Sequence, residues 1–361
     1  MKGFKRCAVT IAVVLILLFT AGCTKGNGII LPDNDFHTAL QYAYINDENV
    51  ENIENYAKGK KELGRPRAIE LKFDDERVLP YDHFVGYSSD EDFSSETVVR
   101  VKSKKNACVY NLEKGRTVYY RRAKTVEKLS LAKTQSITIA SDGPRNLFID
   151  GVSNVRDIGG YDSYLVEGGK IRQGLLLRGG NLNSITESGK AELLRLGIKQ
   201  EIDLRDEQYC LGGFSPEVEY YAVPIPSGTE ETRFEEFADE YTQIFTLISA
   251  AAESPVYLHC SAGADRTGIC VFMLLTLCGA DEKDVARDYL FTNFSVYGSR
   301  LKNFSTEFTK WREKLDAFEG KRAADKAKSW LVSKGLSENE IEKIRETFVE
   351  GYTSELIDEK R

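Results

Sequence analysis

The feature that most constrains the fold of this chain is a short loop between a strand-like run and a helical apolar run. Residues 255–258 are of β type, residues 259–268 read His-Cys-Ser-Ala-Gly-Ala-Asp-Arg-Thr-Gly, and residues 269–277 are apolar. A strand that turns through small residues into a helix directs several backbone N–H groups at one point, where the helix dipole is positive. The pattern therefore predicts a cradle for an anion such as phosphate.

Two side chains give this cradle its chemistry. Cys260 lies at the base, where the field of the helix favours a thiolate nucleophile. Arg266 offers a planar and permanently charged fork to two phosphate oxygens. The alternative is a buried structural thiol beside an arginine in the first turn of a helix, but a cation there opposes the dipole unless it faces an anion.

The rest of the loop is expected to bind or support the phosphate. The predicted phosphate-binding residues are Ser261, Ala262, Gly263, Ala264, Asp265 and Arg266. We expect His259 to brace loop carbonyl groups and Thr267 to donate a hydrogen bond to the departing sulfur. His259 is one of three histidines, and no cluster of side chains has metal-ligand spacing, so we expect no metal.

Cleavage of a phosphate ester also needs a general acid, and two aspartates are candidates. Asp203 ends a strand-like run, and a parallel sheet presents functional groups at that edge. Asp265 lies inside the cradle. We slightly favour Asp203 as the acid. The alternative for Asp203 is a structural role in a salt bridge to Arg205 or Arg178. The alternative for Asp265 is a carboxylate that orients Arg266.

The loop resembles that of the cysteine-dependent protein tyrosine phosphatases, and more narrowly that of their bacterial secreted and lipoprotein branch. Further segments that resemble this branch follow in the same order: residues 154–161, 168–178, 197–205, 288–289 and 292–293. The resemblance covers roughly residues 144–352 and implies an α/β fold whose central, mainly parallel sheet is flanked by helices. It also implies a phosphomonoester hydrolase that works through a phosphocysteine and needs no cofactor.

One departure from that branch bears on the substrate. Ala264 stands where the branch usually has lysine, whose charge would suit the extra phosphates of inositol lipids. We therefore expect a phosphotyrosine-bearing protein or peptide as substrate. Phosphoinositides or inositol phosphates remain an alternative, and an inactive surface-binding protein is a third.

The amino terminus predicts export. Lys2, Lys5 and Arg6 precede an apolar run over residues 8–19, and Thr20-Ala21-Gly22-Cys23 resembles a bacterial lipobox. We expect residues 1–22 to be a signal peptide and Cys23 to carry lipid that anchors the protein to the bacterial cell membrane outside the cytoplasm, with plain secretion as the alternative. Cleavage would move the formal charge from −7 to −10, which disfavours nucleic acid as a partner.

The remainder of the chain divides into three parts. Residues 23–65 are polar and are interpreted as a tether with one possible helix at 47–58. Residues 66–142 contain six short alternating runs that predict a small all-β sandwich, weakly resembling a fibronectin type III module and of unknown partner. Residues 144–361 form the predicted phosphatase domain, in which residues 295–320 could be a lid or a solvated helix and Trp311 and Trp330 are core candidates.

Overall fold

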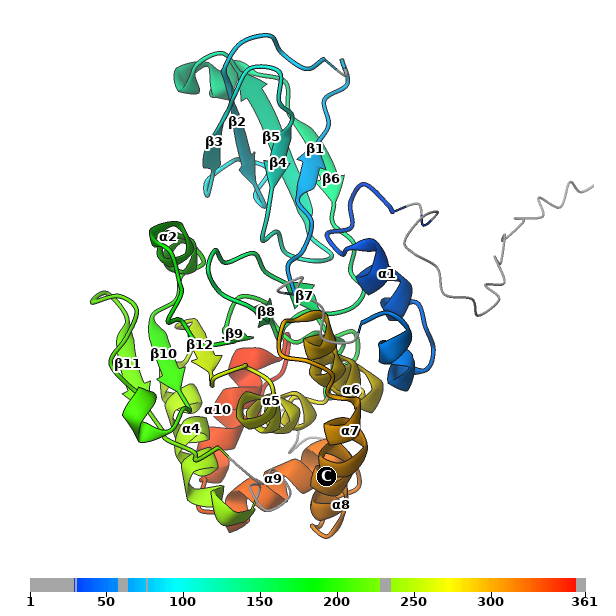
Figure 1. The fold of residues 1–361 in the computed structure, drawn as a ribbon, viewed down its shortest axis with the longest axis vertical. Helices are drawn as coiled ribbons and strands as arrows, with labels where there is room; N and C mark the ends of the chain where they lie inside the picture. Colours follow the sequence, from blue (N-terminus) through cyan, green and yellow to red (C-terminus); the bar gives the residue numbers. More distant parts are fainter. Residues whose placement is uncertain (1–28, 30, 58–63, 76, 228–234, 355–361) are drawn as a thin grey trace, which may run out of the picture.

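The computed structural model describes residues 29, 31–57, 64–75, 77–227 and 235–354. A β-domain and a larger α/β domain make up the molecule, and a short N-terminal helical segment packs against the second (Figure 1). The predicted signal peptide and Cys23 lie outside these residues. Within the described ranges, none of the helices has the length and hydropathy needed to cross a bilayer.

The β-domain has the six strands that the alternating pattern predicts. They are β1 (Ile69–Leu71), β2 (His83–Ser88), β3 (Thr97–Val101), β4 (Ala107–Val109), β5 (Thr117–Ala123) and β6 (Gln135–Thr138). One sheet has the order β3-β2-β5-β6 and the other pairs β1 with β4, all antiparallel. Inward-facing residues of both sheets, among them Ile69, Val85 and Val118, form one apolar core, which is the arrangement of a small sandwich.

The α/β domain is built on a six-stranded sheet in the order β11-β10-β12-β9-β8-β7. Its strands are β7 (Arg145–Asn146), β8 (Arg156–Asp157), β9 (Leu176–Gly179), β10 (Gln200–Asp203), β11 (Glu219–Ala222) and β12 (Val256–His259). The pairs among β9, β10, β11 and β12 are parallel, whereas β7 and β8 join antiparallel at one edge. The predicted α/β class, with a mainly parallel central sheet, is therefore confirmed.

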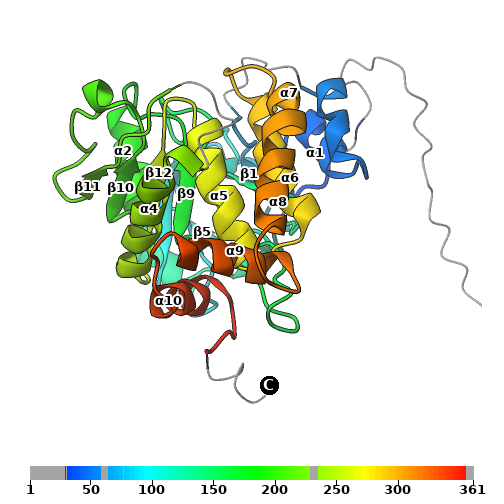
Figure 2. The same cartoon turned by 90° about the horizontal axis from the view of Figure 1, so that it is seen from below.

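Helices surround this sheet and bury the long apolar helix that follows β12. The longer ones are α2 (Glu187–Arg195), α4 (Ala238–Ala251), α5 (Asp265–Leu277), α6 (Glu282–Leu290), α8 (Thr309–Asp316), α9 (Ala323–Ser333) and α10 (Glu338–Phe348). Every residue of α5 after Asp265 is buried, and Figure 2 shows α5 between α4 on one side and α6 and α8 on the other. This burial holds the start of α5, and hence the loop before it, in one place.

Within residues 295–320, residues 301–316 are not a solvated helix, because one of their faces packs into the core. They form α7 (Leu301–Asn303), the turn η5 (Phe304–Phe308) and α8. Phe308 and Trp311 are buried and lie against Phe272 of α5, with ring centroids 5.1 and 5.7 Å away. The aromatic residues of this charged stretch recur at helical spacing, so one face packs into the core. Trp311 and Trp330 are both fully buried, as expected for core residues.

The N-terminal segment also differs from the expected tether. Its helix α1 (Ala39–Ile45) and the 3₁₀ turn η1 (Val50–Asn55) replace the single helix expected at 47–58. Tyr44 and Ile53 are fully buried and belong to the main core of the α/β domain. A Thr38 capping box begins α1. The segment is polar in composition, yet its few large apolar side chains fall on one face and are buried there.

The two domains meet at the turn between β4 and β5. Arg145 donates hydrogen bonds to the carbonyl oxygens of Leu112 (3.0 Å) and Asn111 (2.8 Å). Lys114 is buried, donates to the carbonyl of Gly143 at 2.6 Å and lies over the ring of Tyr161. Burial lowers the pKa of the Lys114 ammonium to about 8.

Candidate active site

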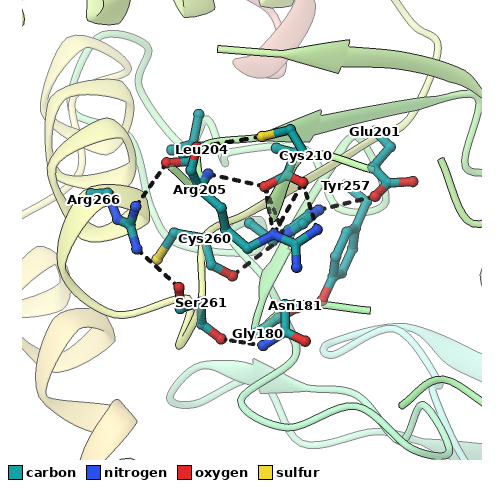
Figure 3. A network of polar contacts seen from close by, with 12 residues as sticks. Gly180, Asn181, Glu201, Leu204, Arg205, Cys210, Tyr257, Cys260, Ser261 and Arg266 are labelled. Atoms are coloured by element: carbon teal, nitrogen blue, oxygen red, sulfur yellow. Dashed lines mark hydrogen bonds and ion pairs between the residues drawn. The ribbon is translucent and has the colours of Figure 1, made fainter. Parts of the chain in front are cut away.

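The loop predicted as a phosphate cradle lies at the carboxyl end of β12, between β9 and β10. Cys260 follows the last residue of β12 and is 3% exposed, and Asp265 begins α5. Figure 3 shows the Cys260 sulfur on the side of the loop where the Arg266 guanidinium lies. The sheet and α5 thus bring the predicted nucleophile and the predicted anion-binding cation together.

The carbonyl groups of four successive loop residues, 261–264, are held from outside the loop. Side chains on three different segments donate to them: Asn181 to Ser261 at 2.8 Å, Asn154 to Ala262 at 2.9 Å, and Arg178 to Gly263 at 2.6 Å and Ala264 at 3.3 Å. In a trans peptide the N–H points opposite to the C=O. The N–H groups of these peptides are therefore directed inward, as a phosphate cradle needs.

Gly263 is required by the shape of the loop. Its φ is +65°, in the left-handed region that glycine adopts without strain. A Cβ at this position would overlap the carbonyl oxygen of Gly179, at the end of β9. The loop consequently packs on β9 with no room for a side chain at residue 263.

Arg266 is fixed by carbonyl groups of two neighbouring segments. Its Nη1 donates to the carbonyl oxygens of Leu204 (3.1 Å) and Ile225 (2.7 Å), and its Nη2 donates to the Ser261 hydroxyl at 3.0 Å. The carboxylate of Asp206 lies 3.8 Å from Nη1, and reasoning from the sequence did not select this neighbour. The guanidinium is thus oriented before any anion binds.

A depression of about 530 Å³ lies beside this arginine. Its lining includes Asp206, Glu207, Tyr209 and Ser227. Tyr209 is largely exposed, and the Ser227 backbone N–H donates to Asp206 at 2.7 Å. This depression is therefore acidic, with one exposed aromatic ring, and Asp206 connects it to Arg266.

An ion network under the loop holds Arg178. Asp288 of α6 lies between Arg178 and Arg156, and all three side chains are buried. Burial raises the pKa of the Asp288 carboxyl, but the two guanidinium groups outweigh it and hold this pKa below its usual range. Arg156 and Asn154 both also contact the Thr292 hydroxyl at 3.3 Å. Segments 154–161, 168–178, 288–289 and 292–293, which resemble the phosphatase branch, thus contact one another and support the loop.

His259 is fully buried beneath the cysteine. Its Nε2 lies 3.0 Å from Glu201 Oε1, and its Nδ1 lies 3.3 Å from the carbonyl oxygen of Cys260. A carboxylate only accepts hydrogen bonds, so Nε2 carries the proton that faces Glu201. The imidazole contacts the backbone of the loop and fixes the end of β12.

Asp203 lies next to His259, and its carboxylate accepts hydrogen bonds from other side chains. Its two oxygens accept from Arg205 at 2.7–3.1 Å and from the Tyr220 hydroxyl at 3.0 Å, and the side chain is fully buried. Burial raises the pKa of this carboxyl, but the hydrogen bonds of Arg205 and the charge of His259 hold it below its usual range. Because both oxygens are engaged in a buried site, Asp203 is not favoured as the acid.

Asp265 is placed differently, at the partly open rim of the loop. Its Oδ1 accepts from the Tyr289 hydroxyl at 3.2 Å and lies 3.1 Å from Arg300 Nε. Neither partner stands near Asp265 in the sequence, so reasoning from the sequence missed both. The Tyr289 position was matched by resemblance alone, while nothing in the sequence pointed to Arg300.

The Thr267 hydroxyl is available to donate a hydrogen bond. Its Oγ1 is buried and makes no hydrogen bond with any part of the chain that the structure describes. Among those same residues, no group of His, Cys, Asp and Glu side chains could hold a metal ion.

Comparisons with known proteins found similar phosphatases. A candidate tyrosine-protein phosphatase of Cupriavidus necator is 26% identical over 177 residues, which cover 42% of this chain and 64% of that protein, less than two thirds of its length. The triple specificity protein phosphatase PtpB of Mycobacterium tuberculosis is 28% identical over 197 residues, covering 41% of this chain and 69% of that protein.

Among solved structures, TpbA of P. aeruginosa is similar with 18% identity and a TM-score of 0.30, covering 42% of this chain and 89% of that one. The model of the family described as "Tyrosine phosphatase family" matches residues 147–355, more than half of the chain. The chain belongs to the tyrosine phosphatase family.

Proposed function

We propose that the protein hydrolyses phosphotyrosine in a protein or peptide through a phosphocysteine intermediate. The observation that carries this proposal is the position of Cys260 beside Arg266, in a loop whose carbonyl groups at residues 261–264 are held outward. Inward N–H groups and a fixed guanidinium stabilise the equatorial oxygens of a phosphoryl group more as charge develops on them.

The reaction has two steps. In the first, the Cys260 thiolate attacks phosphorus, the bond from phosphorus to the phenolic oxygen breaks, and that oxygen takes a proton from the general acid. In the second, water attacks the phosphocysteine, the same carboxylate takes a proton from the water, and the sulfur leaves as thiolate. The free hydroxyl of Thr267 is suited to donate to that sulfur.

Asp265 is the general acid in this proposal, and Asp203 is a structural residue. Asp265 lies at the rim, and its Oδ2 makes no hydrogen bond or ion pair with the residues that the structure describes, whereas both oxygens of Asp203 accept hydrogen bonds in a buried site. A positioned acid contributes typically 10²–10⁴-fold for a poor leaving group.

The acidic surroundings of Arg266 favour a singly phosphorylated substrate. Asp206 and Asp265 both lie close to the cradle, and Ala264 adds no cation to it. The additional phosphates of a polyanionic inositol phosphate would be repelled by the Asp206 carboxylate, while the tyrosine ring of a phosphopeptide would not.

The test is phosphate release by the protein lacking residues 1–22, with Cys260→Ser as the matched control and EDTA present. Phosphotyrosine, phosphoserine and phosphothreonine peptides are compared with a phosphoinositide panel. We expect release from phosphotyrosine peptides that Cys260→Ser abolishes, and phosphate trapped on sulfur in Asp265→Asn. Preference for inositol phosphates would replace the proposed substrate class. Release that does not depend on Cys260 would overturn the mechanism.

We further propose that the mature protein is a lipoprotein anchored through Cys23 outside the cytoplasm, with the β-domain as a fibronectin type III-like spacer. The lipobox-like residues 20–23 and the two-sheet core of the β-domain support this. Mass spectrometry of the membrane fraction should find acyl chains on Cys23, and Cys23→Ala should move the protein to the soluble fraction.

A further inference from the structure

Asp265 is held by groups from two elements distant in the sequence. The Tyr289 hydroxyl comes from α6, and Arg300 comes from the loop between η4 (Phe291–Phe294) and α7. These two groups are the side-chain partners of Asp265 among the residues that the structure describes. The direction of the Asp265 side chain therefore depends on where α6 and the Arg300 loop lie.

The Arg300 loop is itself fixed at several points. The Arg300 backbone N–H donates to Asn293 Oδ1 at 2.5 Å, and its Nη1 donates to the Tyr297 carbonyl at 2.9 Å. The residue before it, Ser299, donates its hydroxyl to Glu54 Oε1 at 2.6 Å. Glu54 belongs to η1, so the N-terminal segment holds this loop directly.

The same segment packs on the other support of Asp265. Tyr44 of α1 lies with its ring centroid 6.1 Å from Phe291 and 5.9 Å from Phe294, at the end of α6. Arg287 of α6 donates to the backbone carbonyl of Asp47 at 3.1 Å. Figures 1 and 2 both show the N-terminal segment beside α6, and Figure 2 shows α1 beside α7 as well. Both elements that hold Asp265 therefore rest on the N-terminal segment.

We propose that the N-terminal segment Ala39–Asn55 positions the general acid, and that Glu54 is a positioning residue that acts through Ser299 and Arg300 on Asp265. The inference rests on the proposed function, in which Asp265 protonates the leaving group. A displacement of about 1 Å in a catalytic group can cost on the order of 10²-fold in rate, so losing one hydrogen bond behind Arg300 has a measurable effect.

If the N-terminal segment positions the acid, its loss should change the kinetics in a way that depends on the leaving group. A leaving group that is already a weak base, such as dinitrophenolate, departs without a proton, while the phenolate of tyrosine or phenol needs one. Loosening Asp265 therefore slows hydrolysis of phenyl phosphate and phosphotyrosine and spares dinitrophenyl phosphate. Damage to the cradle would slow all three.

The experiment compares Glu54→Ala with Glu51→Ala, an exposed glutamate on the same turn of η1. In Glu54→Ala we expect kcat/KM to fall roughly threefold to tenfold for phenyl phosphate and phosphotyrosine peptide and by less than about twofold for dinitrophenyl phosphate. Glu51→Ala should match the wild type on every substrate. Glu54→Gln keeps an acceptor for Ser299 and should restore the activity.

Ser299→Ala removes the same hydrogen bond from the other side and should reproduce Glu54→Ala, which covers the case in which one variant folds poorly. In an Asp265→Asn background, Glu54→Ala should have no further effect on phenyl phosphate. An equal loss on all substrates, or no loss, overturns the inference while Cys260-dependent turnover leaves the proposed function standing. If Asp265→Asn itself shows no dependence on the leaving group, the proposed acid is wrong and the inference falls with it.

Discussion

The Nε of Arg156 lies 2.9 Å from Oδ1 of Asp288, and each side chain is only 1% exposed. Arg178 pairs with the second oxygen of the same carboxylate and donates to the Gly263 carbonyl. One buried carboxylate thus compensates two guanidinium groups, and one of these holds the cradle open. Burial and the charge of Arg156 lower the pKa of Arg178 to about 10, while the Asp288 carboxylate opposes this shift.

Asp288→Asn should therefore be strongly destabilising. It leaves two buried guanidinium groups short of their counter-charge, and breaking a buried pair costs about 3–5 kcal/mol of unfolding free energy. Asp162→Asn is the control, because Asp162 pairs with Lys170 at the surface, where the cost is about 0–1 kcal/mol. Denaturant unfolding of the two variants measures the difference, and equal small losses would contradict this account of the network.

Gly263→Ala should disable the cradle. The position has φ +65°, and the added methyl group would overlap the Gly179 carbonyl, which is backbone and cannot move aside. Gly168→Ala is a matched control, since its φ is +69° but nothing lies within 4 Å of the added atom. The control should lose about 1–2 kcal/mol from backbone strain alone, and should keep its turnover. Gly263→Ala should lose more stability and nearly all phosphate release; retention of activity would show that the loop can shift.

Arg266→Lys should reduce kcat/KM even though the charge is kept. A lysine ammonium cannot contact the carbonyl groups of Leu204 and Ile225 while offering a second nitrogen toward Ser261 and the phosphate. Loss of one fixed donor to a developing charge costs about 10²–10³-fold. Arg312→Lys, at an exposed pair with Glu282, serves as the control. Steady-state kinetics on a phosphotyrosine peptide give the comparison, and a loss below about tenfold would argue against a bidentate role.

The sequence predicted the parts of the site that lie close together in the chain. Cys260 and Arg266 share one loop, so their spacing and the apolar helix after them were enough to place both. The six strands of the β-domain and the parallel strands β10, β11 and β12 were also predictable, because alternating or continuous apolar runs have a period that backbone geometry dictates. The strands β7, β8 and β9 were not predicted, because β7 and β8 consist of two polar residues each and β9 contains the buried Arg178, so that none of the three is a continuous apolar run.

What the sequence did not show depends on contacts between distant segments. The partner of Asp203 could be Arg205 or Arg178 on sequence grounds, and only the fold shows that Arg178 is instead engaged by Asp288. Arg300 reaches Asp265 across 35 positions. The N-terminal segment was taken for a tether because its composition is polar, and composition does not reveal that Tyr44 and Ile53 face one core.

Lys114 makes the stability of the protein depend on pH in the alkaline range. Its pKa is lowered from 10.5 to about 8 by burial between the domains. Between these two values the unfolded chain binds a proton that the folded chain does not, so folding gains stability as pH rises through this window. Below about pH 8 the ammonium is charged in both states, and the cost of burying it is fully present.

Lys114→Met removes this titration together with the hydrogen bond to Gly143 and the contact with the Tyr161 ring. The melting temperature of the wild type minus that of Lys114→Met should therefore increase from pH 7 to pH 10. This holds whether the difference is positive or negative at pH 7. Differential scanning fluorimetry at several pH values measures the difference, with Lys102→Met, at an exposed site, as the control that should stay flat. A difference that does not change with pH would mean that water reaches the Lys114 ammonium, and that the junction between the domains is open.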